Sequence, residues 1–83
     1  MNKRKLFLKV LSGSSNIRFN DVRALIEEFG FQLVRVSGSH HIFERPNVRE
    51  LVNIQNRNGQ AKPYQIRQFL RIVDKYQLEL GDD

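Results

Sequence analysis

The amino-acid sequence predicts one α+β domain with the element order helix, helix, strand, strand, strand, helix. Three observations support this prediction: helical spacing of apolar residues near both ends of the chain, a strand-like middle interrupted by turn residues, and a length of 83 residues. A chain of this length has room for one domain with a thin core. We assign residues 1–16 to a helical extension, 17–78 to the core and 79–83 to a frayed tail.

The first part of the chain predicts two helices. Apolar residues recur at helical spacing from Lys3 to Leu11 with cations between them, and the polar run from Ser12 to Asn16 ends that pattern. A second apolar stripe follows, with Asn20 as its expected N-cap and Asp21 in its first turn. The stripe consists of Phe19, Val22, Leu25, Ile26 and Phe29.

Gly30 predicts where the second helix ends. A glycine in the left-handed conformation just past a helix closes a Schellman motif, in which the next residue contacts the helix three positions before the cap. Phe31 and Ile26 stand at these two positions and are both apolar. The predicted helix therefore stops just before Gly30.

The middle of the chain predicts a three-stranded antiparallel sheet, because runs rich in Val, Ile, Leu and Phe alternate with turn residues. The strands are expected at 31–37, 40–45 and 50–55, with turns at Gly38-Ser39 and Pro46-Asn47 and a loop at 56–60. Pro63 then occupies a first helical position. The last helix is predicted from the stripe Ile66, Phe69, Leu70, Val73 and Tyr76.

The composition indicates a polyanionic partner. Fourteen Lys and Arg against nine Asp and Glu give a net charge of +5 and a pI near 10.1. Nucleic acid fits this charge, and so would an anionic membrane surface or an acidic protein. No cysteine is present and the two histidines are adjacent, so we expect neither disulfides nor a metal cofactor. No signal peptide or membrane span is apparent, so a cytoplasmic location is expected.

Two adjacent histidines follow the Gly38-Ser39 turn, and strand alternation separates them. His41 shares a face with Phe43, whereas His40 shares one with Ile42. If Phe43 is in the core, His40 faces the open side of the sheet and Ile42 is exposed beside it. Imidazole is the side chain whose ordinary pKa suits proton transfer near neutrality. Two strand histidines are nevertheless more often one packed and one solvated residue, and alternation alone leaves both interpretations open.

A basic stripe is predicted on the last helix. Arg67, Arg71 and Lys75 are four residues apart and so share one helical face, while Lys62 precedes the helix N-terminus, where backbone N–H groups favour an anion. An ordinary solvated helix face explains the stripe equally well. The amino-terminal cations at positions 3, 4, 5 and 9 would contact a phosphate backbone or, as is more often the case, simply solubilise the first helix. Tyr64 would stack on a base or pack on the preceding loop.

The chain lacks the motifs of several enzyme classes. It has no Walker-type glycine loop, no carboxylate cluster for Mg²⁺, no HExxH and no GxSxG. The remaining chemistry is what one imidazole and nearby cations can perform on a substrate that carries its own nucleophile. RNA is such a substrate through its 2′-hydroxyl group.

The order of helix, Gly30-Phe31, strand, the run Gly38-Ser39-His40-His41-Ile42-Phe43, a further strand and Lys62-Pro63-Tyr64-Gln65 resembles the HicA toxin family. The resemblance covers about Phe19 to Tyr76, and residues 3–16 indicate a subgroup with a longer amino-terminal part. It implies a double-stranded-RNA-binding-like fold with three antiparallel strands backed by helices. It also implies an endoribonuclease toxin of a type II toxin–antitoxin system that cleaves mRNA and is inhibited by a HicB-type antitoxin.

The same resemblance places the family's essential histidine on His40. We expect His40 to act as general acid or base, and Gly38, Ser39, Lys62, Arg67 and Arg71 to contact RNA, without a metal. The free protein would be a monomer that forms a hetero-oligomer with its antitoxin. The alternatives are a non-catalytic RNA-binding module of the same fold and an interaction protein that docks an acidic partner.

Overall fold

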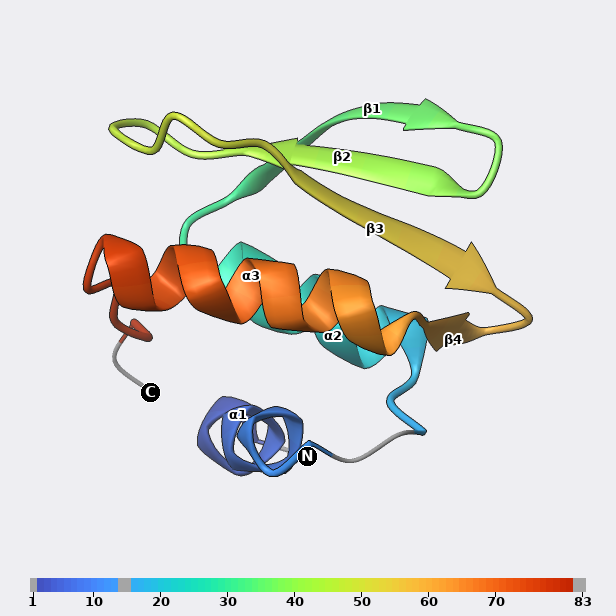
Figure 1. Ribbon diagram of the computed structural model, residues 1–83, viewed down its shortest axis with the longest axis horizontal. Coiled ribbons are helices and arrows are strands. Elements are labelled where there is room, and N and C mark those ends of the chain that lie inside the picture. The colour runs from blue at the N-terminus through green and yellow to red at the C-terminus, as the bar shows by residue number, and fades with distance from the viewer. Residues whose placement is uncertain (1, 14–15, 82–83) are drawn as a thin grey trace.

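The structure is a computed structural model that describes residues 2–13 and 16–81 (Figure 1). Within these residues it has three helices and a four-stranded antiparallel sheet in the order β1-β2-β3-β4. The helices are α1 (Lys3–Leu11), α2 (Phe19–Glu28) and α3 (Pro63–Lys75), and the strands are β1 (Gln32–Ser37), β2 (His40–Glu44), β3 (Val52–Arg57) and β4 (Gln60–Ala61). The α+β class is therefore confirmed.

The elements form layers. Helices α2 and α3 cover one face of the sheet, and α1 lies on the far side of these helices (Figure 1). Helix α1 is attached to α2 by an edge-to-face pair of Phe7 and Phe29, with ring centroids 5.2 Å apart, and by an ion pair of 3.2 Å between Lys3 and Glu28. The other face of the sheet carries none of the described helices and stays open.

Four phenylalanines make up much of the core between the sheet and the helices. Phe69 of α3 makes edge-to-face contacts with Phe29 and Phe31, with ring centroids 5.6 Å and 5.8 Å apart. Phe43 of β2 is fully buried. Burial of each such side chain contributes about 1.5–3 kcal/mol, so this cluster fixes the sheet against α2 and α3.

The predicted end of α2 is confirmed. Gly30 has a φ of +92°, and its N–H donates to the Glu27 carbonyl at 2.9 Å. The N–H of Phe31 donates to the Ile26 carbonyl at 3.3 Å, and both side chains are buried. These are the two bonds and the apolar contact of a Schellman motif. The predicted start of α3 at Pro63 is confirmed as well.

The predicted N-cap of α2 is wrong. Helix α2 begins at Phe19, with Arg18 as the N-cap, so Asn20 lies inside the helix. The reason is a tertiary contact, because the chain before α2 pairs with the β4 hairpin. The N–H of Phe19 donates to the Gly59 carbonyl at 2.9 Å, and the N–H of Ala61 donates to the Ile17 carbonyl at 3.1 Å.

The sheet has four strands, whereas three were expected. The predicted third strand starts and ends two residues later than expected, at Val52–Arg57, and the predicted loop at 56–60 is a hairpin that leads into β4. Asn58 and Gly59 have φ values of +53° and +84°. Positive φ at both central residues is the signature of a type I′ turn, for which Asn-Gly is a preferred sequence. This turn keeps the chain paired where a loop was predicted.

The ends of the chain are described in part. The predicted break at 12–16 and the predicted tail at 79–83 each include residues outside the described ranges. Leu80, within the predicted tail, is partly buried against the core. The division into extension, core and tail stays a prediction. Among the described residues, no helix has the length and apolar character that a membrane crossing requires.

Candidate functional site

The turn between β1 and β2 sets the position of the two histidines. Gly38, with a φ of +59°, and Ser39 form a two-residue connection between Ser37 and His40. A positive φ at the first of the two residues is what a type II′ hairpin turn requires, and glycine adopts it without strain. His40 is therefore the first residue of β2, at the end of the sheet.

His41 lies on the helix side of the sheet. Its ring lies against Phe19 of α2, with ring centroids 4.5 Å apart, and its Nδ1 is 3.1 Å from the Ser39 carbonyl. A carbonyl can only accept, so Nδ1–H is the donor in this bond. His41 therefore links the turn to α2 and is part of the packing.

His40 points to the open side of the sheet, because successive strand residues alternate between faces. Its Nδ1 is 3.2 Å from Oδ1 of Asn53 on β3. An amide oxygen only accepts, so in this contact Nδ1 carries a proton, and in the neutral form of the ring Nε2 then has the free lone pair. His40 is half-buried, and Asn53 holds its ring in one orientation. Sequence analysis missed Asn53, since only the β2–β3 register brings it beside His40.

Ile42 was expected to be exposed beside His40, and this expectation is wrong. Its exposed fraction is 8%. In the sheet register it lies between Arg35 of β1 and Asn53 of β3, which are neighbours on the same face. The open face therefore combines a covered aliphatic centre with polar and cationic side chains around it.

A β-bulge brings Arg35 to the face that carries His40. Leu33 pairs with Phe43, whereas Arg35 pairs with Ile42, so one extra residue, Val34, lies between two successive pairs. A bulge of this kind changes the face to which the following residues point. Without it, Arg35 would point to the same face as Phe43. No sequence signal in the strand predicted this change.

Two further cations, Arg57 and Lys62, lie at the β3–β4 hairpin, beyond the residue that pairs with His40. His40 is paired with Gln55, and Arg57, two residues further along β3, points to the same face as Gln55. Arg57 and Lys62 line one hollow of about 220 Å³ beside the β3–β4 hairpin. The Nζ atom of Lys62 lies 5.9 Å from the centroid of the Tyr64 ring. Lys62, a predicted site residue, thus shares a hollow with Arg57, which strand alternation directs to the same face as His40.

The basic stripe on α3 lies elsewhere. Arg67, Arg71 and Lys75 are exposed residues on the side of α3 that faces away from its buried stripe. Arg71 and Lys75 line a groove with residues from the β2–β3 connection. The structure places Arg67 and Arg71 in the helix layer and His40 on the open sheet face, so these predicted site residues are not brought together.

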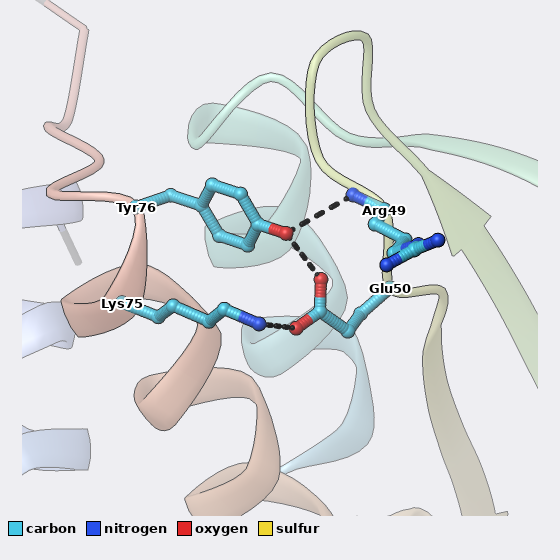
Figure 2. Close-up of polar contacts among 4 residues, drawn as sticks. All are labelled: Arg49, Glu50, Lys75 and Tyr76. Carbon is cyan, nitrogen blue, oxygen red and sulfur yellow. Dashed lines mark hydrogen bonds and ion pairs between the residues drawn. The ribbon is translucent and has the colours of Figure 1, made fainter.

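Lys75 is paired, as Figure 2 shows. Its Nζ donates to Glu50 at 2.8 Å, and the Tyr76 hydroxyl donates to the other carboxylate oxygen at 2.6 Å. The Lys75 and Tyr76 hydrogen bonds lower the pKa of Glu50 from 4.5 to about 2, and Glu50 raises the pKa of Lys75. Tyr76 also accepts the backbone N–H of Arg49 at 3.3 Å. This network anchors the β2–β3 connection to the end of α3.

The acidic and histidine side chains within residues 2–13 and 16–81 include no group of three or more that is arranged to hold a metal ion.

The chain matches a family model described as "HicA toxin of bacterial toxin-antitoxin" over residues 19–74, which is more than half of its length. The match spans α2, the whole sheet and nearly all of α3, and it begins after α1. Searches among curated proteins and solved structures gave no match.

Proposed function

The chain belongs to the HicA family of toxins from bacterial toxin–antitoxin systems, and on that premise we propose that it is an endoribonuclease that cleaves mRNA. Toxins of this family are generally ribonucleases and act with a cognate antitoxin. The observation that carries the proposal is the setting of His40. It lies on the open face of the sheet with Asn53 at Nδ1, and register and strand alternation direct Arg35 and Arg57 to the same face.

The proposed chemistry uses the 2′-hydroxyl of RNA as the nucleophile. Nε2 of His40 accepts the 2′-hydroxyl proton as the 2′-oxygen bonds to the adjacent phosphorus. The bond from phosphorus to the 5′-oxygen breaks, and the leaving oxygen takes a proton from the imidazolium or from water. The products are a 2′,3′-cyclic phosphate and a free 5′-hydroxyl, and no metal takes part.

Positive charge near His40 would stabilise the extra negative charge on the phosphoryl oxygens. Arg35 on β1 and Arg57 on β3 share the face of His40, and Lys62 shares a hollow with Arg57. These three cations support phosphate binding on both sides of the imidazole. Gly38 and Ser39 would contact the RNA backbone at the turn, while Arg67 and Arg71 would contact phosphates further along the strand.

The antitoxin that inhibits this activity is, in our proposal, of the HicB type. The simplest inhibition covers His40 and the cations around it, so that RNA cannot reach the imidazole. The free toxin would be a monomer, and the inhibited form a hetero-oligomer.

The proposal is tested with a purified protein and an end-labelled RNA in the presence of EDTA. The expected result is cleavage to fragments that end in a 2′,3′-cyclic phosphate. A matched RNA with one 2′-deoxynucleotide at the cleaved position is expected to stay intact there. RNA that is bound but uncut in both cases would identify a non-catalytic RNA-binding module. Cleavage that requires an added divalent ion would contradict the metal-independent mechanism.

A further inference from the structure

We propose that a groove between α3 and the end of the β2–β3 connection, directly before β3, binds an extended acidic segment of the antitoxin, which continues as a strand beside β3. The existence of an antitoxin follows from family membership, and its docking here does not depend on the proposed ribonuclease chemistry. We call this surface the β3–α3 groove. It is lined by Glu50, Leu51, Gln68, Arg71, Ile72 and Lys75 and has a volume of about 310 Å³.

The groove has apolar surface that the fold leaves uncovered. Leu51, just before β3, has an exposed fraction of 55%, and Ile72 of α3 is partly buried opposite it. A pair of aliphatic side chains in a concave site is a usual place for an apolar anchor of a bound peptide. The groove is therefore suited to a segment that inserts one aliphatic side chain.

The outer edge of β3 begins directly after Leu51, at the end of the groove. Strand β4 pairs only with Asn56 and Arg57, so the earlier part of β3 has no strand on its outer edge. The N–H of Gln55 points outward and donates to Oε1 of Gln65 at 2.7 Å. Outward groups recur every second residue, so the N–H and C=O of Asn53 are the next pair on this edge. An extended segment can pair with them by strand addition.

The free charge of the groove is positive. Glu50 is already bound by Lys75 and by the Tyr76 hydroxyl, as Figure 2 shows. Arg71 has no ion pair or hydrogen bond among the described residues. Since the whole chain carries +5, an occupant with carboxylates is attracted both at long range and at Arg71. Charge complementarity thus selects an acidic segment.

The other free edge of the sheet is less suited to strand addition. Strand β1 carries the bulge at Val34, and bulges interrupt the regular row of hydrogen-bonding groups that a partner strand needs. The described helices do not form a second wall beside β1 (Figure 1). The β3–α3 groove offers a regular edge, a helix wall and an uncompensated cation together.

The groove is separate from the His40 site. Leu51 precedes Gln55, the partner of His40, by four residues, which is about 13 Å along a strand. Helix α3 also covers the face of the sheet (Figure 1) that is opposite to the face to which strand alternation directs His40. A partner segment would therefore anchor the antitoxin at Leu51 and Arg71, and its pairing with the Asn53 backbone would bring it next to the residue that contacts His40.

Binding of the purified cognate antitoxin, measured by isothermal titration calorimetry, tests the proposal. Leu51→Asp and Arg71→Glu are each expected to raise the Kd about tenfold or more. The matched controls are Leu8→Asp, where Leu8 has a similar exposed fraction of 61%, and Arg4→Glu, both on α1 outside the family match. These controls are expected to leave the Kd within about twofold, a change under 0.5 kcal/mol.

Hydrogen exchange measured by NMR gives an independent readout. The amide of Asn53 is expected to exchange more slowly in the complex than in the free toxin, because it gains a backbone acceptor. RNA cleavage by Leu51→Asp is expected to match that of the parent protein. Leu51→Asp therefore separates the two proposals, because it should weaken antitoxin binding and leave RNA cleavage unchanged. If neither the parent nor the variant cleaved RNA, the proposed function would fail, and the difference in antitoxin binding would still test the groove.

Three results would overturn the proposal. The first is a Kd for the antitoxin that stays within about twofold of the parent value in both Leu51→Asp and Arg71→Glu, or an Asn53 amide that exchanges no more slowly in the complex than in the free toxin. The second is intact antitoxin binding with lost RNA affinity in Arg71→Glu, which would make the groove an RNA site. The third is a toxin dimer that Leu51→Asp dissociates, which would make a second copy the occupant.

Discussion

Each face of the sheet carries one histidine of β2, and the two histidines differ in their contacts. On the helix side, His41 lies against Phe19 and donates to the Ser39 carbonyl. On the open side, His40 makes one polar contact, with Asn53, and no ring contact with the core among the residues that the structure describes. Imidazole is thus a packing group on one face, whereas on the other it is the group that we propose as acid–base residue. The comparison teaches that strand alternation places two neighbouring residues of one type in different environments.

The largest expected effect is on activity, from His40→Ala. We expect RNA cleavage to fall about 10² to 10⁴-fold, the usual contribution of one acid–base residue. The thermal unfolding midpoint should change little, since the side chain lies on the open face. Cleavage rates and circular dichroism on the same preparation check both halves. A folded variant that cuts at the parent rate would remove His40 from the mechanism.

The next effect is on stability, from His41→Ala. Loss of the contact with Phe19 and of the bond to the turn should lower the free energy of unfolding by about 1–3 kcal/mol. Urea unfolding measures this change. His41→Phe keeps the ring and loses only the hydrogen bond, so it should be less destabilising. If His41→Ala abolished cleavage while stability stayed unchanged, the separation between the two faces would be incorrect.

A smaller effect sharpens the role of Asn53 as a positioning residue. Asn53→Ala should slow cleavage about tenfold, which corresponds to the loss of one orienting hydrogen bond. Asn53→Asp keeps an acceptor and adds a negative charge, which favours the protonated imidazole. The pH dependence of cleavage should therefore shift to higher pH in Asn53→Asp. A purely structural role for Asn53 would leave that pH profile where it is in the parent protein.

The smallest expected effect is on stability at acidic pH, from Glu50→Gln, and it tests the hydrogen-bond network at the end of α3. The pKa of Glu50 is lowered from 4.5 to about 2, so its contribution to stability is present above pH 4.5 and is lost as the pH falls toward 2. Glu50→Gln should therefore lose less thermal stability between pH 6 and about pH 3 than the parent. Glu44→Gln, an exposed carboxylate without an ion pair among the described residues, should behave like the parent. Equal acid sensitivity of all three proteins would contradict the stabilising role of the network in Figure 2.

Local sequence signals predicted most of the fold. The α+β class, the three helices, the Schellman end at Gly30 and the start at Pro63 depend on interactions within a few residues. The residues that make such interactions are neighbours in the sequence, so the interactions can be predicted from it. The Asn58-Gly59 turn was available in the same way and would have predicted β4.

The other errors occur where segments far apart in the sequence meet. Asn20 is a good capping residue by type, yet α2 starts earlier because Ile17 and Phe19 pair with the β4 hairpin. Ile42 is covered because strands on both sides place side chains around it. Neither result follows from residues near in sequence.

By itself, the sequence determined that this chain is of the HicA family, with a histidine at the start of a strand and an excess of positive charge. The tertiary structure decided which groups accompany that histidine. Asn53, Arg35 and Arg57 reach the His40 face through strand register and a bulge, and Arg71 is directed into a separate groove. Register and bulges depend on pairing between segments far apart in the chain, so they become visible only when the sheet has formed.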